Sequence, residues 1–273
     1  MRAVTRALRL FAAGALCALP SFAPAADKTV PLAPPAVTAM PSGPFGDAVR
    51  YGLRIMTDTQ GTVHGYVGNG LQCVSCHLGA GRQAYAAPLV GLTGLFPEYR
   101  SRTGRVESLE ERLNDCFLRS MNGKALPSNS KEMIGLLAYI AWLSQGVPTG
   151  SEVLGRGFRE FAAPSPPNAA RGKAIYAAKC AACHGADGQG TKAGATYVFP
   201  PLWGKQSFND GAGMARVSIA AGFVQTKMPL GNAGTLTDQE AYDVAAYFTA
   251  QPRPSFGAKK KDWPAGERPA DAR

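Results

Sequence analysis

Histidine and cysteine are both scarce in this chain, which has three histidines and six cysteines in 273 residues. Six cysteines are too few for a disulfide-stapled mini-protein, so their spacing carries more information than their number. Charged residues make up 18% and hydrophobic residues 45%, a balance that excludes a largely disordered chain. A chain of this length is expected to fold as about two domains, each with its own core.

Acidic residues are fewer than basic ones, 19 against 29, which gives a formal net charge of +10. A basic chain can bind nucleic acid, but no nucleic-acid-binding motif accompanies this charge. The chain also begins with an export signal, so we expect no nucleic-acid partner.

Long apolar runs are absent after the first 25 residues, which have the pattern of a secretory signal peptide. Arg2, Arg6 and Arg9 form a positive region, an apolar stretch follows over Leu10 to Leu19, and Ala23-Pro24-Ala25 has the small residues of a cleavage site. The apolar stretch is too short to span a bilayer, which makes a retained membrane anchor the weaker alternative. We expect a periplasmic protein without membrane insertion, in which residues 26–45 form an N-terminal extension.

Two segments, Cys73-Val-Ser-Cys76-His77 and Cys180-Ala-Ala-Cys183-His184, share the pattern C-x-x-C-H, the attachment signature of c-type haem. The two thiols add to the vinyl groups of the haem, and the adjacent histidine lies under the iron. The alternative is a redox dithiol or zinc, but zinc would need two further ligands per site, and only His64 and Cys116 remain. The pattern predicts two covalently bound haem c groups, held by Cys73, Cys76, His77, Cys180, Cys183 and His184.

The residues around the two motifs form an internal repeat. A helical pattern precedes each motif, and an apolar helix follows each, over 133–143 and 238–248. Asn129–Glu132 and Thr237–Glu240 have the sequence of capping boxes that would begin these later helices. Each half is therefore predicted to be an all-α cytochrome c domain, in which the N- and C-terminal helices cross and a haem lies between them.

The expected limits of the two domains follow from this internal repeat. The first domain would span 46–148 and the second 169–252, joined by a proline-containing linker at 149–168. Residues 253–273, which include a run of lysines, are expected to be a charged, solvated extension on the surface.

The distal ligand of the second haem can be narrowed by elimination. Only His64 remains as a third histidine, so two bis-histidine haems are impossible within one chain, and a lone histidine is more often structural. Met228, followed by Pro229 in a glycine-flanked loop before the last helix, has the usual position of a distal methionine. Such ligation raises the reduction potential and suits electron transfer. Met214 is the competing candidate.

The first domain has no Met-Pro pair in the corresponding stretch, and Met121 and Met133 are poorly placed alternatives. Cys116 stands there instead, unpaired in an oxidising compartment. One interpretation is a buried, inert residue that behaves as a small hydrophobe. The other is a thiolate ligand of the first haem, which would stabilise ferric iron and lower its potential.

Several basic residues accompany Cys116. They form either a solvated basic face or a pocket for a small dianion, because guanidinium groups match oxyanions with paired hydrogen bonds. These residues are Arg102, Arg105, Arg112, Arg119 and Lys124.

Three segments resemble the thiosulfate dehydrogenase family of dihaem cytochromes c: Tyr99 to Gly123, Pro200-Pro-Leu-Trp-Gly204 and Phe208 to Met214. With both haem motifs and Lys227-Met228-Pro229, the resemblance covers nearly the whole chain after the signal peptide.

This resemblance implies roles for particular residues. Cys116 would be the distal ligand of the catalytic haem in the first domain, and the substrate pocket would be lined by Arg102, Arg112 and Ser120. In the second domain, Met228, Lys227 or exchange between them would ligate the electron-transfer haem.

The implied enzyme is a thiosulfate dehydrogenase that joins two thiosulfate ions into tetrathionate. It would pass two electrons to a small acceptor, such as a cytochrome c or a high-potential iron–sulfur protein, and could run in reverse as a tetrathionate reductase. One alternative is a non-catalytic dihaem electron carrier, which would need a second methionine ligand. The other is a sulfur-oxidation cytochrome that loads thiosulfate onto a carrier protein.

Overall fold

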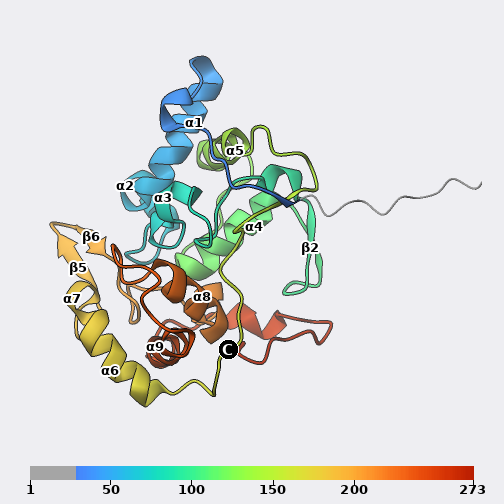
Figure 1. Cartoon of the computed structure of the whole chain (residues 1–273). Coiled ribbons are helices and arrows are strands. Elements are labelled where there is room, and N and C mark those ends of the chain that lie inside the picture. Colours follow the sequence, from blue (N-terminus) through green and yellow to red (C-terminus); the bar gives the residue numbers. More distant parts are fainter. Residues whose placement is uncertain (1–28) are drawn as a thin grey trace, which may run out of the picture.

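The computed structural model describes residues 29–273, so the predicted signal peptide lies outside the described residues. The chain folds into two helical units, and Figure 1 shows the first above the second. The first unit contains α1 (Gly43–Thr57), α2 (Thr59–Val63), α3 (Leu78–Gly81), α4 (Leu109–Asp115) and α5 (Lys131–Leu143). The second contains α6 (Ala169–Lys179), α7 (Ala181–His184), α8 (Val217–Lys227) and α9 (Asp238–Ala250).

Short helical turns connect these helices. Those of the 3-10 type are η1 (Val37–Ala39), η2 (His64–Tyr66), η3 (Cys73–Ser75), η4 (Leu92–Gly94), η6 (Gly213–Ala215) and η7 (Gly257–Lys261). One further turn, η5 (Cys116–Ser120), is π-helical and directly continues α4.

The first unit is built on the crossing of α1 and α5. The buried residues Val49, Gly52 and Ile55 lie three apart on α1, so one stripe of this helix faces the core. At the crossing, Gly52 lets α1 approach the backbone of α5 at Gly135 so closely that any Cβ would collide with its carbonyl oxygen. The crossing of N- and C-terminal helices is as the sequence predicted.

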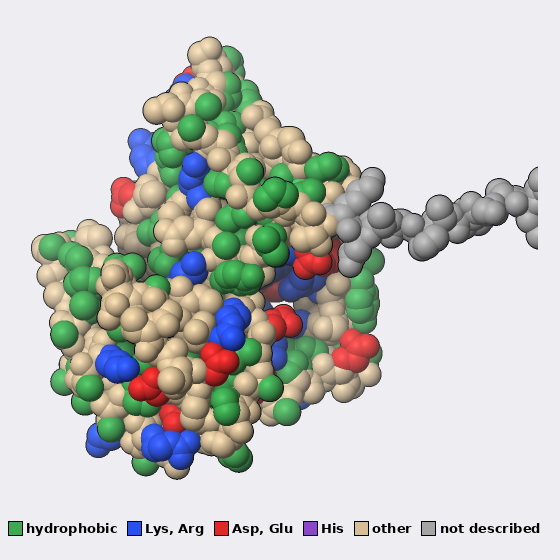
Figure 2. All heavy atoms as spheres, in the orientation of Figure 1, with side chains coloured by type: hydrophobic (Ala, Val, Ile, Leu, Met, Phe, Trp, Pro, Cys, Tyr) green, Lys and Arg blue, Asp and Glu red, His purple; other side chains and the backbone are tan. Residues whose placement is uncertain are grey.

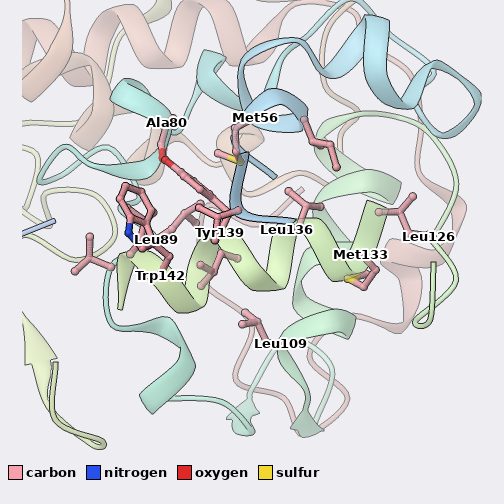
Figure 3. Close-up of a cluster of buried hydrophobic side chains, with 14 of the residues drawn as sticks. Met56, Ala80, Leu89, Leu109, Leu126, Met133, Leu136, Tyr139 and Trp142 are labelled. Atoms are coloured by element: carbon pink, nitrogen blue, oxygen red, sulfur yellow. The ribbon is translucent and has the colours of Figure 1, made fainter. Parts of the chain in front are cut away.

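Beneath this crossing lies the core of the first unit, in which Tyr139 and Trp142 of α5 are fully buried. Figure 3 shows the Tyr139 ring reaching across the core to the Ala80 backbone, and its hydroxyl donates a hydrogen bond of 2.8 Å to the Ala80 carbonyl. The same cluster contains Met133, which is therefore a packing residue.

The second unit repeats the arrangement with α6 and α9. Gly172 on α6 packs against the Asp243 carbonyl of α9, where a Cβ would collide. Thr237 and Glu240 form the predicted capping box at the start of α9. The corresponding prediction for α5 was wrong by one residue, because Ser130 rather than Asn129 accepts the hydrogen bond from Met133 N and the helix begins at Lys131.

The two units are packed against each other. Leu71 and Met121 of the first unit are buried in the core of the second. The Asn69 side chain donates hydrogen bonds to the carbonyls of Ser120, at 2.8 Å, and Ser207, at 3.0 Å, and so ties one unit to the other.

The fold is mostly helical, as predicted, but it also contains three two-stranded ladders that the helical periodicity did not indicate. A parallel ladder joins β1 (Thr29–Val30) to β4 (Glu152–Val153), which fastens the N-terminal extension to the segment between the units. The antiparallel ladders are β2 (Glu98–Arg100) with β3 (Arg105–Glu107), and β5 (Thr191–Ala193) with β6 (Thr196–Phe199).

The prediction that residues 253–273 are a solvated extension was wrong for its central part. Trp263 is 8% exposed, and the Asp262 side chain is 4% exposed. The aromatic ring of Trp263 favours burial, and the carboxylate of Asp262 is paired with arginine. These two residues hold the middle of the tail against the protein, although the adjacent lysines favour solvent.

None of the helices in residues 29–273 is long and apolar enough to cross a membrane. On the face drawn in Figure 2, Lys and Arg side chains are scattered among Asp and Glu and do not form one basic patch.

Gly52→Ala is expected to destabilise the protein by about 1–3 kcal/mol, because the added methyl group pushes α1 away from α5. Thermal unfolding of the holoprotein checks this. Gly65→Ala is the matched control, since a Cβ at Gly65 meets nothing within 4 Å. Equal midpoints of thermal unfolding for Gly52→Ala and Gly65→Ala would show that the crossing of α1 and α5 tolerates a side chain.

Candidate active site

Each histidine of the two C-x-x-C-H motifs is oriented by a backbone carbonyl. His77 Nδ1 lies 2.6 Å from the Ala87 carbonyl, and His184 Nδ1 lies 2.8 Å from the Pro200 carbonyl. Because the carbonyl oxygen accepts, Nδ1 carries the proton in both rings and Nε2 is left as the lone-pair nitrogen. This is the tautomer that an iron ligand needs.

The first motif is held by neighbouring polar side chains. The Thr59 hydroxyl, fully buried, accepts a hydrogen bond of 3.0 Å from Cys73 N. Gln72 and Ser75 cap the turn η3, on which Cys73 lies. In the second motif, Cys180 lies where α6 meets α7, and the Thr191 hydroxyl donates to the Cys183 carbonyl at 2.7 Å.

A cavity in the second unit opens beside the second motif. Its walls include Cys180, Cys183 and His184 together with the two methionines, Met214 and Met228. Lys227 does not line this cavity; it is half-buried, and burial lowers its pKa. Thiols, an imidazole with a free nitrogen and a thioether in one apolar cavity fit a haem c group.

The same cavity extends to the first motif. Val74, Ser75 and Cys76 form part of its wall, although they belong to the first unit. The two haem attachment segments therefore lie next to each other across the interface between the units.

Cys116 lies at the junction where α4 widens into the π-helical turn η5. The capping box of Ser108 and Glu111 fixes the start of α4, two turns earlier. Single π-helical turns of this kind occur frequently at functional sites. The turn also carries Ser120, one turn after Cys116 and half-buried.

The thiol of Cys116 is in an environment that favours the thiolate. Burial raises its pKa, but Arg112 and the nearby His77 ring more than offset this and bring the pKa of Cys116 down to about 7. Arg112 donates a hydrogen bond of 3.3 Å to the Cys116 sulfur.

The four potential haem-binding groups of the first unit lie together. Burial, and in part the charge of Cys116, raises the pKa of Cys73 to about 11 and that of Cys76 to about 12. His77 faces Cys116 from the side of the motif. One imidazole near one low-pKa thiol, with two thiols beside them, fits a haem c group that His77 and Cys116 would hold. This arrangement argues against Cys116 being inert.

The predicted basic cluster is smaller in the structure than in the sequence. Arg112 and Arg119 both lie close enough to Arg102 for their charges to lower its pKa. Arg105 and Lys124 are exposed, and Arg105 is paired with Glu111 at 2.7 Å, so for these two the solvated basic face is the alternative that holds. The two are separated from the cluster because their side chains point into solvent.

Other candidates from the sequence lie elsewhere. His64 is exposed on η2, and Met121 is buried in the core of the second unit.

Sequence reasoning missed Asp115 and Asp262, which pair with Arg119 at 3.4 Å and 2.8 Å. The only signal for Asp262 was the large aromatic residue that follows it in an otherwise charged tail.

Comparisons with known proteins agree with this geometry. Residues 66–149 match the family described as SoxA/TsdA, cytochrome c domain, and residues 169–250 match the cytochrome c family. A thiosulfate dehydrogenase from Psychrobacter arcticus is 48% identical over 88% of this chain and 73% of its own length. One from Allochromatium vinosum is 48% identical over 84% of this chain and 86% of its own.

The chain belongs to the thiosulfate dehydrogenase family. Its structure superposes on thiosulfate dehydrogenase (TsdBA) from Marichromatium purpuratum, "as isolated" form, with a TM-score of 0.79 and 42% identity. The match covers 82% of this chain and spans half, 50%, of the TsdBA chain. Two cytochrome c domains in tandem give this family member two covalently bound haem c groups.

Met228→Leu is expected to lower the reduction potential of the second haem, because it would remove the predicted thioether ligand, and loss of such a ligand destabilises ferrous iron. Potentiometric titration followed by absorbance measures this. Met214→Leu is the matched control from the same cavity wall and should leave the potential nearly unchanged. If Met214→Leu lowers the potential and Met228→Leu does not, the assignment of Met228 is wrong.

Proposed function

We propose that this protein oxidises thiosulfate to tetrathionate and delivers the electrons to an external acceptor. The observation that carries the proposal is the Cys116 thiol, with a pKa near 7, between His77 and the Arg112 guanidinium. A simple electron carrier has no use for a reactive thiolate at this position. The relationship to thiosulfate dehydrogenases supplies the substrate class.

The arginines have a clear task in this reaction. Thiosulfate is a dianion, and bringing two of them together is opposed by their mutual repulsion. Guanidinium groups bind sulfur oxyanions with paired hydrogen bonds and reduce that repulsion. Arg102 and Arg112, with Ser120 on the same helical segment as Arg112, are the proposed binding residues.

Cys116 is the proposed nucleophile, and in this role its sulfur would leave the haem iron that it holds at rest. A bond between Cys116 Sγ and the terminal sulfur of the first thiosulfate releases two electrons. The terminal sulfur of the second thiosulfate then attacks the Cys116-bound sulfur, which forms tetrathionate and returns Cys116 to the thiolate. The second step transfers no further electrons, so one cycle yields one tetrathionate and two electrons.

The haem groups, when bound, supply the electron-accepting chemistry, one electron for each iron. His77 and Cys116 would hold the catalytic haem of the first domain. His184 would hold the electron-transfer haem of the second domain, with Met228 as the distal ligand and Lys227 as its replacement on ligand exchange. Attachment would use Cys73, Cys76, Cys180 and Cys183.

We also propose the cellular compartment in which the reaction takes place. A signal peptide over residues 1–25 would export the chain to the periplasm. The acceptor would be a small redox protein, either a cytochrome c or a high-potential iron–sulfur protein. Tetrathionate reduction is the same chemistry reversed.

A sulfur-oxidation cytochrome that loads thiosulfate onto a carrier is the second candidate, because the matched family description includes SoxA. The two functions differ in their product. The loading reaction needs a carrier protein as acceptor and releases no free tetrathionate.

Cys116→Ala is expected to lower thiosulfate turnover at least about a hundred-fold, since the proposed nucleophile is lost. Steady-state oxidation of thiosulfate with ferricyanide measures this. Lys124→Gln removes an exposed cation of the first unit that lies outside the arginine cluster, and it should retain full activity. Normal turnover by Cys116→Ala with both haems attached would eliminate the covalent mechanism.

A further inference from the structure

The C-terminal tail after α9 forms a bridge from the second unit back to the arginine cluster of the first. Its near end is fixed by Asp210 of the second unit, whose carboxylate accepts hydrogen bonds from Phe256 N at 2.7 Å and Lys259 Nζ at 2.6 Å. Asp210 N also donates to the Pro254 carbonyl at 2.9 Å. In Figure 1 this red segment lies below the β2 hairpin, beside the second unit.

The far end of the bridge carries Asp262. Its carboxylate accepts two hydrogen bonds of 2.8 Å from the guanidinium of Arg119, the paired geometry of a strong arginine–carboxylate interaction. The same carboxylate lies 3.6 Å from Arg102 Nε. Asp262 therefore contacts two of the three clustered arginines at once.

Trp263 holds Arg102 from a second side. Its backbone N–H donates to the Arg102 carbonyl at 2.7 Å, and the Arg102 guanidinium lies 4.9 Å from the centre of its ring. Trp263 has a φ of 57°, in the left-handed region that bulky residues rarely adopt. Such a conformation persists only where surrounding contacts over-determine it.

Electrostatics explain why the arginines need this support. The pKa of Arg102 is lowered to about 10, mainly by burial and also by the charges of Arg119 and Arg112, whereas Asp262 and Asp115 act in the opposite direction. Without a carboxylate among them, the three cations would repel one another and favour exposure to solvent.

We propose that Asp262 and Trp263 are positioning residues that hold Arg102 in the substrate pocket, so that the C-terminal tail completes the thiosulfate site. Neither residue needs to touch thiosulfate. This inference rests on the proposed function, because it assigns the tail a part in binding the same substrate.

The Asp262→Asn variant distinguishes the positioning of Arg102 by Asp262 from a simple effect of the Asp262 charge on thiosulfate binding. Removing a negative charge near the pocket would by itself strengthen the binding of a dianion, whereas loss of the arginine geometry weakens it. We expect an affinity for thiosulfate about ten-fold lower, as for loss of one charge-assisted hydrogen bond. Calorimetric titration of the chemically reduced holoprotein measures binding without turnover, and kcat/KM for thiosulfate should fall by a similar factor.

One control variant and a second test variant both come from the C-terminal tail. Asp271→Asn removes a carboxylate that binds Arg216 and Ser218 of the second unit, and it should leave thiosulfate affinity unchanged. Trp263→Leu keeps the Asp262–Arg119 pair and removes only the ring beside Arg102, so it should also weaken binding. If Asp262→Asn loses haem or unfolds, Trp263→Leu decides the question.

Unchanged or tighter thiosulfate binding by Asp262→Asn and Trp263→Leu would overturn the positioning role. If instead the wild-type protein neither binds nor oxidises thiosulfate, the proposed function itself fails. The two failures are distinguished by the wild-type measurement alone.

Discussion

A thiolate inside a protein requires compensating positive charge, and much of this structure supplies it to Cys116. Arg112 donates to the Cys116 sulfur from the preceding turn, and His77 faces it from the haem motif. The guanidinium groups near this thiol require acids in turn, which Asp115 and Asp262 provide. This chain of charges connects α4, the first haem motif and the C-terminal tail, and it supports the proposal that sulfur chemistry takes place in the first unit.

The internal repeat builds two similar haem sites that differ on one side. Both units cross their terminal helices at a glycine, and both orient the motif histidine through a backbone carbonyl. The difference lies in the other side chains near the motif histidine. The second unit presents methionines in an apolar cavity, which suits electron transfer, and the first presents a thiol beside arginines.

Features encoded by short spacing were predictable from the sequence. The C-x-x-C-H motifs and the capping box of α9 depend on residues that are near neighbours in the chain. The contact of Arg119 with Asp262 joins residues 143 positions apart, and no local pattern specifies it. The ladder of β1 with β4 was also missed. Its two strands are far apart in the chain, and each has only two residues, too few for a recognisable pattern. The domain limits and the site roles remain predictions.

The central claim is that thiosulfate leaves this protein as free tetrathionate with both electrons transferred. The most direct measurement gives the purified holoprotein thiosulfate and ferricyanide at mildly acidic pH and quantifies tetrathionate against ferricyanide consumed. We expect one tetrathionate for every two ferricyanide ions over many turnovers. Haem reduction without free tetrathionate, or no ferricyanide consumption at all, would contradict it.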